Sequence, residues 1–115
     1  MPGFEQGDVV RVPFPYVDRN RRQHRPALVI SSSGMGPGDA LLWVVMITSA
    51  ENEAWEGDVA IEDHVGVGLP VPSVIRLVKI ATIEAARAER LGHLPRVTLD
   101  KVMARVRSVV GQQEH

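Results

Sequence analysis

The chain has 115 residues, with 13 lysines and arginines against 14 aspartates and glutamates, and it has no cysteine. This length and a near-average apolar content predict one globular domain over residues 1–115 and exclude a disordered chain. The lack of cysteine excludes a disulfide scaffold and thiol chemistry, and it removes the usual zinc ligands. The first residues lack a secretory pattern, and the longest apolar run, 40–48, is too short to cross a bilayer. We therefore expect a cytoplasmic protein with no membrane partner.

In chain order, the first half predicts three strands. Residues 7–13 alternate valine with polar residues, as in a strand with one buried face, and prolines then stop it. Residues 14–24 are polar and rich in arginine, and we expect a long, mobile connection there. Residues 25–33 form the next predicted strand, followed by a glycine-rich loop over 31–39. Residues 40–48 are apolar on both faces, which predicts a central strand.

The second half predicts shorter elements. Residues 50–57 have room for one short helical turn, and residues 58–62 alternate as a half-exposed strand. Residues 64–72 are rich in turn-forming residues, and residues 73–83 are rich in branched apolar residues that favour a strand. Residues 84–91 are compatible either with a helical turn or with a strand.

The last element is an amphipathic helix. Its apolar residues recur at helical spacing, with Thr98 as the expected N-cap and Gly111 as the stop. The apolar positions are Leu99, Val102, Met103, Val106, Val109 and Val110. We expect this face to dock on the sheet. Short strands, long loops and one terminal helix together predict a mainly β fold, a small and partly closed antiparallel barrel.

Common catalytic motifs are missing from the sequence. The four histidines, at positions 24, 64, 93 and 115, are isolated from one another, so no metal site is expected. The glycine-rich stretch 34–38 lacks the lysine of a phosphate-binding loop, and no nucleophile elbow occurs. We therefore expect neither a metal nor another cofactor.

Arginines and hydroxyl groups at predicted strand ends are the remaining candidates for chemistry. The sequence contains eleven arginines and only two lysines, and five of the arginines fall within residues 11–25. Arginine binds phosphate oxygens in a bidentate manner, although a solvated charged surface would have the same composition. Arg25 directly precedes Pro26, which stiffens the chain at that point. Thr48 and Ser49 end the predicted central strand, where they could instead cap a helix. Arg76 interrupts an apolar run, where it could instead lie on the exposed face of an edge strand.

Taken together, these segments resemble the MazF/PemK (Kid) family of bacterial toxins. The resemblance rests on residues 7–10 (GDVV), 25–30 (RPALVI), 47–49 (ITS) and 90–94 (RLGHL), followed by the terminal helix. It implies the SH3-like barrel shared with the toxin CcdB, in a homodimer. It also implies a metal-independent endoribonuclease that cleaves single-stranded RNA at a specific sequence, and a cognate antitoxin as partner. In this reaction the RNA 2′-hydroxyl attacks its own phosphodiester, which leaves a cyclic phosphate and a 5′-hydroxyl.

The resemblance also implies roles for individual residues. Arg25, Thr48 and Arg76 correspond to residues that stabilise or protonate the phosphate. The residues expected to hold RNA are Arg19, Arg21, Arg22, His24, Ser49, Ser73 and Lys79. The two tryptophans, Trp43 and Trp55, are expected in the core or at a dimer contact.

One departure from the family pattern concerns the general base. Many members have a carboxylate two residues after the position of Arg76, where this chain has Val78. Three alternatives remain for an active enzyme: Lys79 substitutes electrostatically, His24 acts as the base, or catalysis rests on Arg25 and Thr48. A further alternative is a barrel that does not cleave RNA, and that only holds an antitoxin or poisons DNA gyrase as CcdB does.

Overall fold

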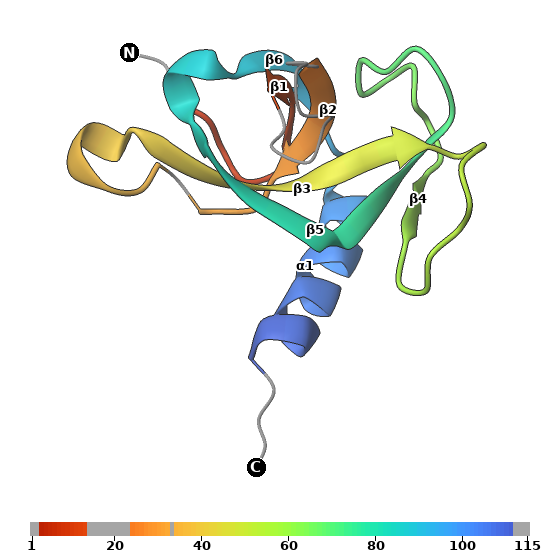
Figure 1. Ribbon diagram of the computed structural model, residues 1–115. Coiled ribbons are helices and arrows are strands. Elements are labelled where there is room, and N and C mark those ends of the chain that lie inside the picture. The colour runs from red at the N-terminus through yellow and green to blue at the C-terminus, as the bar shows by residue number, and fades with distance from the viewer. Residues whose placement is uncertain (1–2, 14–23, 33, 112–115) are drawn as a thin grey trace.

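A computed structural model describes residues 3–13, 24–32 and 34–111, which form a strongly curled sheet with one helix beside it (Figure 1). The strands are β1 (Asp8–Pro13), β2 (His24–Val29), β3 (Leu41–Ser49), β4 (Val59–Ile61), β5 (Ser73–Glu84) and β6 (Glu89–His93). Two short 3-10 helices, η1 (Pro37–Asp39) and η2 (Ala85–Arg87), precede β3 and β6, and α1 (Arg96–Val110) ends the fold. All ladders are antiparallel, in the order β4-β5-β3-β2-β1-β6. The predicted mainly β fold with a C-terminal helix is confirmed.

The curled sheet encloses two apolar clusters, and β3 contributes to both. Its Val45 and Ile47 face the larger cluster, which α1 covers with Leu99 and Val102. Leu42, Val44 and Met46 of β3 belong to the second cluster, together with Val10 and Val12 of β1. Because successive strand residues point to opposite faces, burial of both faces requires an apolar run. This explains why the prediction of a central strand is confirmed to within one residue.

A bulge bends β5 in its middle. Val45 of β3 pairs with Ile80, but the next residue, Met46, pairs with Arg76. Residues 77–79 are therefore inserted into one side of the ladder, and inserted residues increase local bend and twist. Figure 1 shows the sharp bend of β5. The bulge contains Val78, which is exposed, and Lys79.

The end of the second strand and the segment after β3 differ from the predictions. The second strand ends at Val29, because beyond Ile30 the hydroxyl of Ser31 accepts the hydrogen bond from the Trp43 amide. Residues 50–57 hold turns and no helix, so the predicted helical turn there is wrong. Residues 84–91 contain both predicted alternatives in succession, since η2 is followed by β6.

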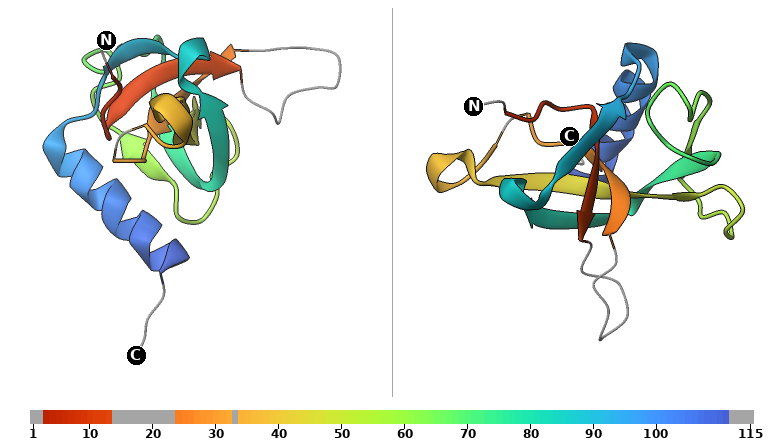
Figure 2. Two further views of the ribbon diagram at one scale, coloured as in Figure 1. Left: turned by 90° about the vertical axis from the view of Figure 1, so that its left-hand side faces the viewer. Right: turned by 90° about the horizontal axis from the view of Figure 1, so that it is seen from above.

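The terminal helix begins earlier than predicted. Pro95 occupies the N-cap position, and Leu99 donates its amide hydrogen to the Pro95 carbonyl at 2.9 Å, so Thr98 lies inside the first turn. Gly111 follows the last helical residue, as predicted. The apolar face docks only in its first half, because Val109 and Val110 are 61% and 67% exposed. Figure 2 shows α1 extending past the sheet, which explains their exposure.

A buried carboxylate joins β1 to β6. Asp8 is 3% exposed, and its Oδ2 accepts hydrogen bonds from Arg90 Nη2 at 2.7 Å and from the Glu5 amide at 2.8 Å. His93 Nδ1 lies 2.9 Å from Asp8 Oδ1. Burial acts to raise the pKa of Asp8, but hydrogen bonds from Arg90, Glu5 and His93 outweigh it and hold the pKa below its ordinary value of 3.8.

Replacement of Asp8 by asparagine is expected to change the acid dependence of stability. A carboxylate with a lowered folded-state pKa stabilises the fold above its ordinary pKa, and this contribution is lost as the pH falls through the lowered value. The Asp8→Asn protein should lose about 1–3 kcal/mol of unfolding free energy at neutral pH. Its stability should also fall less than that of the wild type between about pH 5 and pH 2. Urea unfolding at a series of pH values measures the loss and its dependence on pH. If the unfolding free energies of the two proteins fell in parallel with pH, Asp8 would not be the source of this acid dependence.

Candidate active-site pocket

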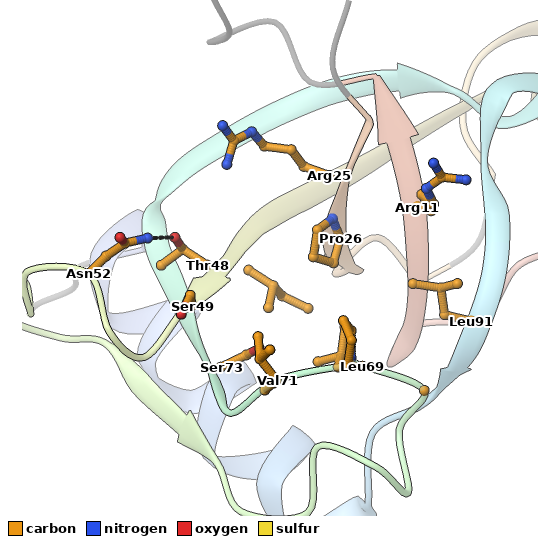
Figure 3. A pocket seen from close by; sticks show the side chains of 13 residues that line it. Arg11, Arg25, Pro26, Thr48, Ser49, Asn52, Leu69, Val71, Ser73 and Leu91 are labelled. Carbon is orange, nitrogen blue, oxygen red and sulfur yellow. Dashed lines mark hydrogen bonds between the residues drawn. The ribbon is translucent and has the colours of Figure 1, made fainter.

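An open pocket of about 420 Å³ lies where β1, β2 and β3 approach the segment before β5 (Figure 3). Its apolar residues include Leu69, Val71 and Leu91, which lie toward the lower and right side of the view, while Arg25, Thr48 and Asn52 lie toward the top and left. The thirteen lining residues are Arg11, Arg25, Pro26, Ile47, Thr48, Ser49, Asn52, Gly68, Leu69, Pro70, Val71, Ser73 and Leu91. We call this cavity the Arg25 pocket. Its volume lies within the range of small-ligand sites.

Two arginines reach the Arg25 pocket from neighbouring strands. Arg25 lies near the start of β2 and pairs with Val12, while Arg11 of β1 pairs with Pro26. Pro26 has no amide hydrogen and a restricted φ, so the strand backbone that carries Arg25 is held stiffly. None of the described lining residues is acidic. The Arg11 guanidinium also forms an exposed ion pair with Glu89 of β6, with Nη1 3.5 Å from Oε1. Arginines at the rim of a pocket are typical partners of an anion such as a phosphodiester.

Hydroxyl groups at the end of β3 face the same pocket. Thr48 is 7% exposed, and its Oγ1 accepts a hydrogen bond of 2.7 Å from Nδ2 of Asn52. Ser49 Oγ accepts one of 3.1 Å from the Glu51 amide. Since no helix follows, the alternative interpretation of these two residues as a helix cap is wrong. Ser73 Oγ donates to the Val71 carbonyl at 2.8 Å, so toward a ligand it can act as an acceptor.

The wall formed by residues 68–71 is held by close backbone contact with β6. A side chain at Gly92 would collide with the backbone of Val67, and one at Gly68 would collide with the Leu91 carbonyl. Gly68 also has a φ of +88°, a conformation that glycine adopts readily. Only glycine therefore allows this wall to approach β6 so closely.

Replacement of Gly92 by alanine is expected to lower the free energy of unfolding by about 1–3 kcal/mol, because the added methyl group forces two backbone segments apart. Urea unfolding measures this loss. The matched control is Gly111→Ala, where the new Cβ would lie 3.5 Å from the Arg107 carbonyl and meet no clash. Equal stability of the two variants would contradict the close-contact argument.

Arg76 is not among the residues that line the Arg25 pocket. It is 6% exposed, and its Nη2 and Nε donate to Asp58 Oδ2 at 2.8 Å and Oδ1 at 3.2 Å. Nη2 also donates to the Glu53 carbonyl at 2.7 Å, and the Trp55 ring covers the guanidinium at 4.2 Å. The interpretation of Arg76 as an exposed edge residue is therefore wrong. Its observed anionic partner is a carboxylate, so the geometry gives no support to the expected contact with a phosphate.

The Arg76–Asp58 ion pair shifts both pKa values in the stabilising direction. Hydrogen bonds from Arg76 hold the pKa of Asp58 below its ordinary value, and the same bonds raise the pKa of Arg76. The two residues are brought together by the β4–β5 ladder, in which Val59 pairs with Ile75. Asp58 precedes the first of these and Arg76 follows the second, so they lie opposite each other.

The other residues expected to hold RNA lie in different places. Ser49 and Ser73 line the Arg25 pocket, but His24 and Lys79 do not. His24 is exposed at the first position of β2, and the Lys79 ammonium lies 5.1 Å from the Trp55 ring centre. Arg19, Arg21 and Arg22 lie outside the described residues, as does most of the connection expected over 14–24. Neither tryptophan is in the core, since Trp43 and Trp55 are 48% and 40% exposed.

Sequence comparison decides the family. Residues 5–110 match the sequence profile described as PemK-like, MazF-like toxin of type II toxin-antitoxin system. The chain belongs to this toxin family. No match to a curated protein was found. Within the described residues, no three His, Cys, Asp or Glu side chains are grouped to hold a metal ion, and no helix is long and apolar enough to span a membrane.

Solved structures of MazF toxins share the fold of this family member. MazF in a MazE–MazF complex from Deinococcus radiodurans (Form-II) is 23% identical with a TM-score of 0.74, covering 98% of this chain and 100% of that one. MazF alone from the same organism (Form-I) is 23% identical, with a TM-score of 0.71 and coverage of 97% and 100%. An endoribonuclease in complex with its cognate antitoxin, from a Mycobacterial species, is 19% identical, with a TM-score of 0.69 and full coverage of both chains. The predicted MazF-type barrel is therefore confirmed.

Two of the polar pocket residues of this MazF-like toxin were not predicted from its sequence. Arg11 reaches the pocket because β1 pairs with β2, which places it opposite Pro26. Asn52 lies four residues after Thr48. The chain turns back there, since the backbone amide of Asn52 donates to the Ser49 carbonyl at 3.1 Å. A polar residue shortly after a strand-end threonine was the only signal available for Asn52.

Proposed function

We propose that this toxin is a sequence-specific endoribonuclease that cleaves single-stranded messenger RNA in the cytoplasm without a metal ion. One observation carries the proposal: Arg25, Arg11 and Thr48 line the same pocket, and none of its described lining residues is acidic. Attack by the RNA 2′-hydroxyl needs no nucleophile from the protein. It needs proton transfer and stabilisation of the negative charge that develops on the phosphate.

The proton of the attacking 2′-hydroxyl would pass to water or to His24, at the exposed start of β2, and the departing 5′-oxygen would take a proton from water. The other residues would stabilise charge and hold the RNA. Arg25 would donate to the non-bridging phosphate oxygens, where charge increases in the transition state. Thr48 would donate a hydrogen bond to the same phosphate or to the departing 5′-oxygen. Ser49 and Ser73 would hold the adjoining nucleotide, and Lys79, His24 and the arginines at 19, 21 and 22 would attract the RNA backbone. Arg76 would act through the ion pair with Asp58 rather than through the phosphate.

The proposed reaction is tested with chemically matched oligonucleotides. The protein should cleave an RNA strand, leave the DNA strand of the same sequence intact, and lose activity when a single 2′-hydroxyl is removed at the cleaved position. Only a mechanism that uses that hydroxyl as the nucleophile gives this pattern. Cleavage of the singly deoxygenated RNA at the same bond would contradict the proposed chemistry.

We propose that a cognate antitoxin covers the Arg25 pocket when the toxin is inactive. Family membership supports an antitoxin partner, and the similar structures include complexes of a toxin with its antitoxin. An antitoxin segment with carboxylates would pair with Arg11 and Arg25 and exclude RNA. Coexpression with the product of the adjacent gene should suppress RNA cleavage; unchanged cleavage by the purified complex would argue against this arrangement.

We propose a homodimer that covers the exposed face of α1. A groove of about 650 Å³ between this helix and the sheet is lined by Trp43, Met103, Val106 and Val110 among others, and Trp43 and Val110 are 48% and 67% exposed. Exposed apolar patches of this kind are typical of subunit interfaces. Sedimentation equilibrium should give the mass of two chains, and a Val110→Glu variant should give the mass of one. A monomeric wild-type protein would contradict the proposal.

A further inference from the structure

The hydrogen bond between Asn52 and Thr48 has a defined direction. The Asn52 amide nitrogen carries only hydrogens to donate, so Thr48 Oγ1 accepts at 2.7 Å. A threonine hydroxyl has one hydrogen, and here that hydrogen is directed to an acceptor other than Asn52. Because Thr48 is 7% exposed and lines the Arg25 pocket, a phosphate oxygen bound there would be well placed to accept it.

The loop that carries Asn52 is held in place from outside the pocket. Arg76 donates to the carbonyl of Glu53, the residue next to Asn52, and forms its ion pair with Asp58 at the end of the same loop. At the other end, the Ala50 amide donates to the Pro72 carbonyl at 2.9 Å. Asn52 itself is exposed, so burial alone does not position it.

From these contacts we infer that Asn52 is a positioning residue that keeps the Thr48 hydroxyl turned as a hydrogen-bond donor toward the scissile phosphate, in a loop anchored by Arg76. This inference rests on the proposed ribonuclease function. It assigns a role to a residue outside the strand-end pattern, and it gives Arg76 an indirect part in the same site.

The sharpest test reverses the polarity of this hydrogen bond at nearly constant shape. In Asn52→Asp the carboxylate would accept the Thr48 hydrogen and so remove it from the phosphate. The accompanying change Glu51→Gln restores the net charge, so that repulsion of RNA is not the cause of any loss. We expect the Glu51→Gln/Asn52→Asp protein to show a kcat about 10–100-fold below that of the wild type, which has the same net charge, with KM nearly unchanged. Glu51→Gln alone should cleave RNA at nearly the wild-type rate. Asn52→Ala, which leaves the hydroxyl unoriented, should lose less.

A double-mutant cycle separates positioning from a general structural role. In a Thr48→Val background the Asn52 changes should have no further effect on kcat, because their target is absent. If the wild type cleaves RNA but the losses are additive in the cycle, the inference is overturned and the proposed function stands. The same conclusion follows if the Asn52 changes raise KM and leave kcat unchanged. A wild-type protein that leaves RNA intact would contradict the proposed function and, with it, this inference.

Discussion

The Arg25→Ala protein is expected to cleave RNA about 10²–10³-fold more slowly than the wild type while remaining folded. Removing one preorganised donor to a developing oxyanion has an effect of this size. Arg25 lies at the rim of an open pocket rather than in either apolar cluster, so its loss should leave the sheet intact. Single-turnover cleavage of a short RNA, followed beside thermal unfolding, measures both quantities.

The matched control for this loss is another arginine, one that does not line the pocket. Arg96, at the start of α1, has a side chain that is 82% exposed and forms a long 3.8 Å ion pair with Asp100. The Arg96→Ala protein has the same change of net charge and should cleave RNA at nearly the wild-type rate. Similar losses in the two variants would assign the effect of Arg25 to overall charge and contradict its place in the site.

The Arg76→Ala protein is expected to lose about 3–5 kcal/mol of unfolding free energy, because Asp58 would be left without its partner in a buried site. The side chains of Arg76 and Asp58 are only 7% and 10% exposed. This loss is a large share of the stability of a small domain. Urea unfolding should show a lower midpoint with an unchanged slope.

Removing both charges provides the control for this ion pair. An Arg76→Met/Asp58→Leu protein should recover much of the stability, since apolar replacement of a buried ion pair is often neutral. It should still cleave RNA slowly if the loop that carries Asn52 is misplaced. A stability loss below about 1 kcal/mol for Arg76→Ala would contradict the buried pair, since that value is typical of exposed ion pairs.

Local patterns were sufficient to predict β3 and most of α1. The residues of β3 are apolar on both faces, and the helix shows its 3.6-residue period, so each element carries its own signal. The start of α1 was missed because proline replaced the expected hydroxyl cap. The exposed Val109 and Val110 belong to the same periodic face as buried Leu99, and no local pattern indicates where the sheet beneath them ends.

The environment of Arg76 depended on contacts far apart in the sequence. Its partner Asp58 lies 18 residues earlier, and the two meet only because the short strand β4 pairs with β5. Arg11 likewise reaches the pocket only through the β1–β2 ladder. The joint presence of Arg25 and Thr48 in one site was anticipated from the resemblance to the toxin family, and the structure places both at the same pocket.

The central claim is tested most directly by incubating the EDTA-treated protein with a long single-stranded RNA and mapping the ends of the products. The proposed mechanism predicts cleavage at one short recurring sequence, with cyclic phosphate and 5′-hydroxyl ends, and loss of that cleavage in the Arg25→Ala protein. Intact RNA after incubation with the folded protein, or products with 5′-phosphate ends, would contradict it.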